Sequence, residues 1–151
     1  ITTGVYLLLH QDLWKWIVAE PEIAPNAVTE LLRYAPPIGV ARLAAQDMVA
    51  QDVELRAGQL ALLSIENACH DPQRYDEPDA IDFGRDPGKQ MMFGAGPHFC
   101  LGANLAKVTY TVALEMLAMR FPGLSLAGGP DDVTWDYETF HGIVHLPVRL
   151  H

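Results

Sequence analysis

The sequence predicts an α+β fold that is mainly helical and carries small β-sheets. In two segments, residues 3–20 and 101–120, apolar residues recur every three or four positions, which is the period of an amphipathic helix. Residues 38–66 and 134–150 contain short apolar runs bounded by turn-forming residues, which is typical of strands and hairpins. A length of 151 residues, 1–151, is the usual size of one domain.

The first third of the chain predicts two helical segments. Residues 3–20 read as one helical stretch, which the prolines of "AEPEIAPN" interrupt. "PNAVTELLRYAPP", residues 25–37, predicts a compact second helix. Pro25 and Asn26 favour its start, and Pro36 and Pro37 end it.

The middle of the chain changes character. "IGVARLA" (38–44), "DMVAQDVEL" (47–55) and "QLALLSIE" (59–66) read as strands, and "RAG" (56–58) reads as a hairpin turn. Residues 67–92 are rich in proline, glycine and charge, so we expect a long ordered meander with little regular structure. A loop of that length in a compact domain is usually functional, or else conceals a helix or strand that the pattern does not reveal.

The last third predicts a long helix over residues 101–120 and a closing hairpin in "TWDYETFHGIVHLPVRL". "FPG" ends the helix. Its expected broad apolar face consists of Leu105, Val108, Val112, Leu114, Met116, Leu117 and Met119.

Composition narrows the class of protein. The net charge is −9, with 10 basic against 19 acidic residues, which disfavours binding to nucleic acid or to an anionic membrane. The two cysteines form no disulfide framework, and free thiols fit the cytoplasm. The longest apolar run near the start, "VYLLL", is too short to span a bilayer. The opening "ITTGVYLLL" reads as the tail of an apolar helix, so we expect the chain to be part of a longer one.

The stretch "FGAGPHFCLGANLAK", residues 93–107, carries the chemistry. Cys100 sits among Gly94, Gly96 and Gly102, which permit unusual backbone angles and close approach to a flat ligand. The expected helix start favours a thiolate there. A thiolate in such a loop is a nucleophile or a metal ligand.

Several uses of this thiol remain open from the residues alone. A cysteine hydrolase would need a base in reach, and His98 is the nearest in sequence. Cys69, His70, His98 and Cys100 have the right types for zinc, although neither pair has typical zinc spacing. Haem iron needs one protein thiolate only, because the porphyrin supplies four donors. Cys69 itself fits a buried packing role.

"FGAGPHFCLG" resembles the haem-binding signature of cytochrome P-450 monooxygenases, Phe-x-x-Gly-x-x-x-Cys-x-Gly. Phe93, Gly96, Cys100 and Gly102 fill the fixed positions. The bacterial-type version adds Gly94 and His98, and both are present. The resemblance implies the C-terminal portion of the P-450 fold, with haem b (iron protoporphyrin IX) ligated by Cys100.

The family's second mark, Glu-x-x-Arg, matches Glu30 and Arg33 in "ELLR". The resemblance implies a buried structural clamp between the helix and the meander. The family often adds an arginine from the meander, where Ala80 stands in this chain. We therefore expect the clamp to be incomplete, or Arg85 or His70 to substitute.

The resemblance also assigns residues around the haem and the substrate. Arg42 and His98 would bind the propionates, and Phe93 would shield the thiolate. Ala103 and Ala106 would leave room for the ring. Substrate contacts would come from Ile38 to Val40, and from Thr139 and Phe140 at the tip of the hairpin.

The implied activity is insertion of one oxygen atom from O2 into a small, mostly apolar substrate, with electrons from a ferredoxin or flavodoxin-like donor. The donor would dock near Lys89 and Lys107. The acid–alcohol pair that delivers protons is expected upstream of Ile1, because Thr2 and Thr3 lie too close to the turn at His10. The missing N-terminal portion, or a complementary chain, would complete the site. A haem-thiolate peroxygenase or isomerase, or a non-catalytic P-450-like binding module, remain the alternatives.

Overall fold

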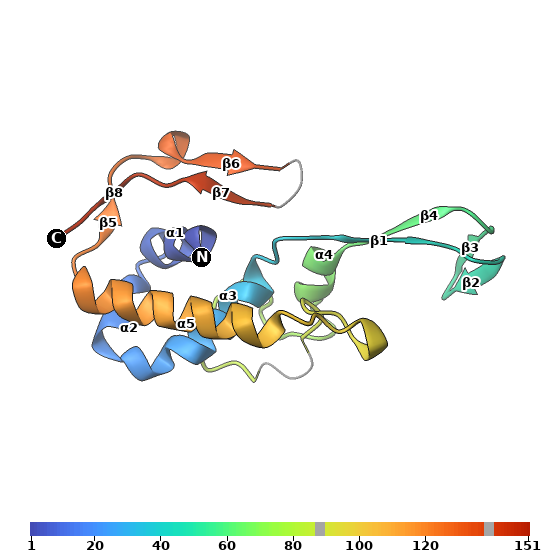
Figure 1. Ribbon diagram of the computed structural model, residues 1–151, viewed down its shortest axis with the longest axis horizontal. Coiled ribbons are helices and arrows are strands. Elements are labelled where there is room, and N and C mark those ends of the chain that lie inside the picture. Colours follow the sequence, from blue (N-terminus) through green and yellow to red (C-terminus); the bar gives the residue numbers. More distant parts are fainter. Residues whose placement is uncertain (87–89, 138–140) are drawn as a thin grey trace.

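The computed structural model describes residues 1–86, 90–137 and 141–151 (Figure 1). Helices α1, α2, α3 and α5 lie together, with a β-hairpin on one side and a long two-stranded arm on the other (Figure 1). The helices are α1 (Thr2–His10), α2 (Trp14–Ala19), η1 (Pro21–Ile23), α3 (Ala24–Tyr34), α4 (Ile65–Cys69), η2 (Gly96–His98), α5 (Ala103–Arg120) and η3 (Pro130–Asp132). The mixed, mainly helical class is as the sequence predicted.

Four antiparallel strand pairs complete the described fold. The strands are β1 (Val40–Leu43), β2 (Met48–Ala50), β3 (Val53–Leu55), β4 (Leu60–Leu63), β5 (Ser125–Leu126), β6 (Thr134–Asp136), β7 (Gly142–His145) and β8 (Val148–Arg149). The pairs are β1 with β4, β2 with β3, β5 with β8 and β6 with β7. The predicted closing hairpin is therefore present as β6 and β7.

The segment 47–55 is a hairpin and not the single strand that the pattern predicted. It folds back at Gln51, whose φ of 54° lies in the left-handed region, so that Ala50 pairs with Val53. The "RAG" stretch is a turn but joins no hairpin, because β3 pairs with β2 and β4 pairs with β1. Gly58 supplies its positive φ of 82°, and its N–H donates to Ala44 O at 2.8 Å.

The predicted helical stretch over residues 3–20 is broken in the middle. Asp12 has a φ of 58°, and the Leu13 N–H reaches back to Leu8 O at 2.8 Å. This bond closes the end of α1 in a Schellman arrangement, with a short polar residue at the left-handed position. Two helices with different directions result, and the apolar spacing alone did not reveal the bend.

Residues 64–66 belong to a helix start and not to the predicted third strand. The Ser64 hydroxyl caps α4 by accepting a hydrogen bond from the Asn67 N–H at 3.1 Å. After α4, the described residues between 70 and 95 contain neither helix nor strand, as expected for the meander.

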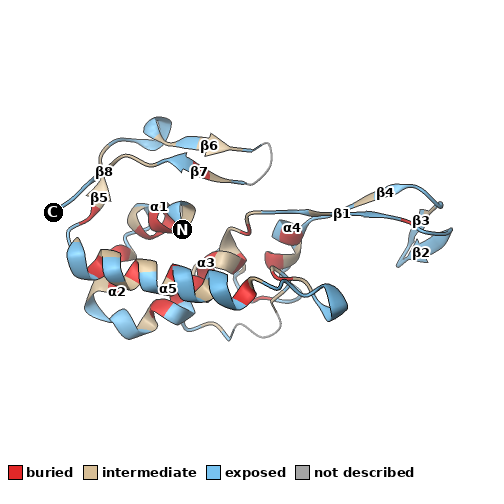
Figure 2. Ribbon diagram, in the orientation of Figure 1, coloured by how far each residue is buried: buried red, intermediate tan, exposed pale blue. Residues whose placement is uncertain are grey.

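The core lies where α1, α2, α3 and α5 meet (Figure 2). Its largest fully buried apolar side chains are Leu8, Ile17, Val28, Leu31, Phe83 and Leu114. None of the helices within the described residues is long and apolar enough to cross a membrane.

The predicted apolar face of α5 is only partly buried. The helix packs on α2 and α3 through Tyr110, Leu114 and Ala118, which are buried. Leu105, Val108, Val112, Met116 and Met119 are exposed. Because α5 carries apolar residues around most of its circumference, their pattern could not select the buried side.

Candidate metal centre

Cys100 lies in the short connection between η2 and α5. Its N–H donates a hydrogen bond to Phe93 O at 2.9 Å, which closes the loop. The Cys100 carbonyl then accepts from the Ala103 N–H at 3.2 Å as α5 begins. The side chain is exposed, and its sulfur is a free thiol. The loop therefore presents one sulfur atom outward from a backbone that is fixed on both sides.

The glycines of this loop serve different purposes. Gly94 has a φ of 72° and Gly96 a φ of 66°, which other residues adopt only at a cost. Gly102 does not need a left-handed backbone, since its φ is −84°. A Cβ on Gly102 would stand 3.9 Å from the Cys100 Sγ. Our expectation that all three glycines allow unusual angles is therefore wrong for Gly102. The absence of a side chain at Gly102 instead leaves space next to the sulfur.

The residues on either side of Cys100, Phe99 and Leu101, are apolar and exposed. Phe93 is largely buried, with Phe99 beside it at 6.4 Å between ring centroids, whereas Leu101 is fully exposed. Ala106 is exposed on α5, but Ala103 is buried in the protein, so only Ala106 lies open to a ligand. An outward thiol flanked by exposed apolar side chains suits a flat, mostly apolar ring.

The donor set fits a haem better than the other candidate centres. Within the described residues, no group of three or more His, Cys, Asp and Glu side chains could hold a metal ion, so the four zinc candidates are not brought together. Cys100 is a free, exposed thiol, and among the described residues no hydrogen bond joins it to His98, as a nucleophile and its base would require. A single exposed cysteine sulfur matches the one protein ligand that haem iron would need.

The two residues predicted for the propionates are available but are not brought together by any contact. Arg42 lies on β1 with an exposed side chain, and its Nη1 donates to the neighbouring Ala41 O at 2.9 Å. His98 ends η2 and is also exposed. Both side chains keep donors free for an anionic group, and their roles stay predictions.

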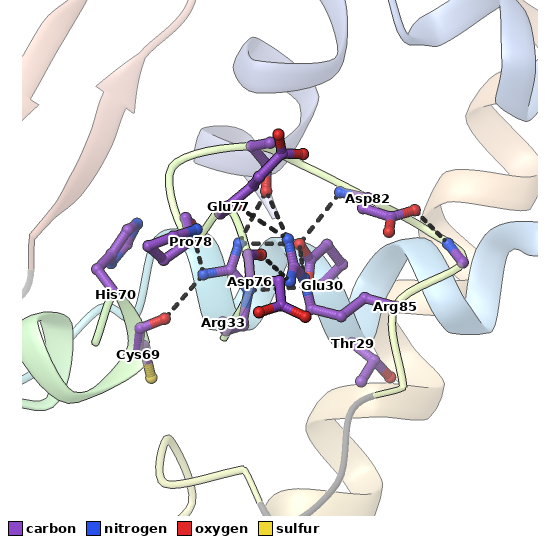
Figure 3. A network of polar contacts seen from close by, with 12 residues as sticks. Thr29, Glu30, Arg33, Cys69, His70, Asp76, Glu77, Pro78, Asp82 and Arg85 are labelled. Carbon is purple, nitrogen blue, oxygen red and sulfur yellow. Dashed lines mark hydrogen bonds and ion pairs between the residues drawn. The ribbon is translucent and has the colours of Figure 1, made fainter. Parts of the chain in front are cut away.

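The predicted clamp is present and has a third member (Figure 3). Arg33 donates from Nε to Glu30 Oε2 at 2.9 Å and from Nη2 to Glu30 Oε1 at 2.8 Å. Arg85 Nε donates to the same Oε1 at 3.0 Å. Of the alternatives that the sequence left open, the substitution by Arg85 is confirmed, because Arg85 supplies the charge that Ala80 lacks. His70 does not substitute, since its Nδ1 lies 3.0 Å from Glu66 O.

The clamp joins α3 to α4 and to the meander. Arg33 Nη1 donates to Cys69 O and to Pro78 O, both at 2.8 Å, and Nη2 reaches Ala80 O at 3.0 Å (Figure 3). Ala80 therefore takes part in the clamp through its backbone carbonyl. The identity of its side chain could not predict this contact. Burial alone would raise the pKa of Glu30, but hydrogen bonds from Arg33, the Asp82 N–H and Arg85 hold it below its usual range.

Cys69 plays the packing role that its sequence context indicated. It is fully buried at the end of α4, and burial raises the pKa of its thiol. One contact that the sequence reasoning missed comes from Gln90, whose Nε2 donates to Thr29 O at 2.8 Å. No local pattern signals that bond, because it joins positions 61 residues apart.

The predicted substrate contacts are only partly described. Ile38 is exposed and Val40 is half-buried at the start of β1. Thr139 and Phe140, like Lys89, lie outside the described residues. The His141 N–H donates to Pro37 O at 2.9 Å, so the residues that flank the two predicted stretches meet. Thr3 is engaged elsewhere, because its hydroxyl accepts from the Ile143 N–H at 3.2 Å.

Comparison with known proteins agrees with this geometry. Residues 19–132 match the family model described as cytochrome P450. The chain is 42% identical to 6-deoxyerythronolide B hydroxylase of Saccharopolyspora erythraea, over 99% of this chain and 38% of that protein. It is 41% identical to nocardicin C N-oxygenase of Nocardia uniformis subsp. tsuyamanensis, over 97% of this chain and 37% of that protein.

Solved structures give the same result. The crystal structure of CalO2 superposes with a TM-score of 0.92 at 34% identity, covering 99% of this chain and 38% of that one. The tirandamycin C-bound P450 monooxygenase TamI gives a TM-score of 0.92 at 35% identity, covering 99% of this chain and 39% of that one. The chain thus spans well under half the length of the relatives that it matches.

Proposed function

Because this chain belongs to the cytochrome P450 family, we propose that it is the C-terminal, cysteine-bearing portion of a haem-thiolate monooxygenase. The observation that carries the proposal is the outward, unpaired Cys100 in its glycine loop at the start of α5. Relatives whose names describe a hydroxylase and an N-oxygenase support oxygen insertion as the reaction.

In this proposal the residues of the cysteine loop bind and shield the cofactor. Cys100 ligates the haem iron, while Phe93 keeps water from the sulfur on the inner side. Arg42 and His98 pair with the propionates, since buried carboxylates need donors. When bound, the haem supplies activation of O2, which the electron-rich thiolate favours.

Substrate and partners follow from the same assignment. Ile38, Val40, Thr139 and Phe140 contact a small, mostly apolar substrate, whose entry the neighbouring hairpin would border. A ferredoxin or flavodoxin-like protein supplies electrons at the cysteine side, and the protein acts in the cytoplasm. The acid–alcohol pair for proton delivery would belong to the part of the whole protein that this chain does not contain, since the chain covers 38% of 6-deoxyerythronolide B hydroxylase.

The test is the absorption spectrum of the reduced, CO-bound, haem-loaded protein. We expect the red-shifted Soret band typical of thiolate ligation. Cys100→Ser and Cys100→His should each abolish that band, whereas Cys69→Ala, which removes the other thiol, should retain it. A red-shifted band in either Cys100 variant would disprove the ligand assignment.

A second experiment separates monooxygenation from the alternatives. With isotopically labelled O2 and an electron donor, a monooxygenase transfers one labelled atom to the product. Product formation with hydrogen peroxide alone, and none with O2, would indicate a peroxygenase. Rearrangement without incorporation of oxygen would indicate an isomerase, and haem binding without any turnover would favour a binding module.

A further inference from the structure

Lys107 lies one turn inside α5 and reaches back over the cysteine loop. Its Nζ stands 5.5 Å from the centroid of the Phe93 ring. Side chains on a helix lean toward the helix N-terminus, which explains how a residue at this position covers a ring that precedes the helix. The distance lies within the range of about 6 Å in which a cation is attracted to an aromatic face.

The ring under Lys107 is coupled directly to the sulfur-bearing residue. Phe93 O accepts the hydrogen bond from the Cys100 N–H at 2.9 Å, and the Phe93 side chain is only 8% exposed. Any force that holds the ring therefore also holds the loop that carries the thiol.

The charge of Lys107 is not neutralised by a carboxylate of the described residues. The ion pairs among them are Lys15 with Asp12, and Arg33 and Arg85 with Glu30. A positive charge that is not cancelled favours a nearby site when that site gains an electron. Groups around a coordinating ligand tune the iron in this way.

We propose that Lys107 is a positioning residue that, through its contact with the Phe93 ring, raises the midpoint potential of the haem bound by Cys100. This inference rests on the proposed function. It assigns to Lys107 a role inside the protein, apart from any contact with an electron-donor protein. The cation holds the Phe93 ring against the loop, and the ring holds the cation near the loop that carries the thiol, so one-electron reduction of the iron becomes easier.

The experiment measures the midpoint potential of the haem-loaded protein by spectroelectrochemistry, with no donor protein present. Lys107→Gln should shift the potential in the negative direction, and Lys107→Arg should restore most of the original value. Lys15→Gln is the matched control, because it removes the same charge from an exposed pair on another part of the chain. An unchanged potential in Lys107→Gln, or an equal shift in Lys15→Gln, would overturn the proposal.

A double-mutant cycle tests the path through the ring. In a Phe93→Leu background the shift caused by Lys107→Gln should largely disappear, whereas a full shift there would refute the role of Phe93. The CO-bound spectrum distinguishes a failure of haem-thiolate ligation from a failure of the role of Lys107. A wild-type protein without the red-shifted band contradicts the proposed function. Red-shifted bands in all variants with equal potentials contradict only the role of Lys107.

Discussion

Arg33 and Glu30 are joined by two parallel hydrogen bonds, from Nε to Oε2 at 2.9 Å and from Nη2 to Oε1 at 2.8 Å. Both side chains are buried, with 1% and 5% of their surfaces exposed. The pair lies one helical turn apart on α3, so local geometry suffices to form it. Its remaining bonds reach Cys69 O in α4 and the meander, so it connects α3 to the long segment that precedes the cysteine loop.

Glu30→Gln should destabilise the protein strongly. The change removes the charge that balances the buried Arg33, and an uncompensated buried charge costs about 3–5 kcal/mol. Urea unfolding followed by circular dichroism would measure the loss in unfolding free energy. Asp12→Asn is the control, because it breaks an exposed pair worth about 0–1 kcal/mol and retains a residue type that tolerates a positive φ. Equal effects of the two changes would contradict the buried-clamp interpretation.

Arg85→Met should cost less than Glu30→Gln but remain clearly measurable. Arg85 donates to Glu30 Oε1 at 3.0 Å and to Asp76 O at 2.6 Å, and hydrogen bonds to charged groups contribute about 1.5–3 kcal/mol each. The double variant with Glu30→Gln should lose less than the sum of the single losses, because both changes break one network. Arg74→Met, a matched meander arginine, should have a small effect. Strict additivity of the two clamp changes would count against a shared network.

The clamp also predicts the response to acid. The folded-state pKa of Glu30 is lowered from its ordinary value of 4.5, so the unfolded chain binds the proton more readily. The stabilisation is therefore complete above pH 4.5 and is lost as the pH falls through the folded-state pKa. Unfolding free energies measured across this range should fall less steeply for Glu30→Gln than for wild type. Parallel curves would show that Glu30 does not contribute.

Gly94→Ala and Gly102→Ala should fail in different ways. Alanine at position 94 must adopt a φ of 72°, which costs roughly 1–2 kcal/mol of stability. Alanine at position 102 meets no such strain, but its Cβ stands 3.9 Å from the Cys100 Sγ. Thermal unfolding without cofactor should detect only the first change, and haem titration should show weakened binding for the second. Unimpaired haem binding by Gly102→Ala would show that the haem does not approach the backbone closely at position 102.

Arg42→Ala should accelerate the loss of haem while preserving the thiolate spectrum. A charge-assisted bond of about 1.5–3 kcal/mol corresponds to a roughly 10- to 100-fold faster dissociation. Transfer of haem to an acceptor protein would measure this rate. Arg56→Ala, an exposed arginine near the end of the same arm, is the control. Equal rates for wild type and Arg42→Ala would exclude the propionate role.

Short-range features were predictable from the sequence. These features depend on contacts within a few residues. They are the spacing of Glu30 and Arg33, the positive φ of the glycines at positions 94 and 96, and the helix after Cys100. The positions of the predicted substrate residues could be followed only in part, because Thr139 and Phe140 lie outside the described residues.

The sequence by itself determined the family, the mixed fold class, the lone thiol in its glycine loop and the two charged residues of the clamp, because motif spacing and backbone preference are local properties. Tertiary structure decided that Arg85 completes the clamp 55 residues from Glu30, and that β1 pairs with β4. It also selected Tyr110, Leu114 and Ala118 as the buried side of α5. These contacts join residues that are far apart in the sequence. Their free energy depends on how the whole chain packs, so no short stretch of sequence predicts them.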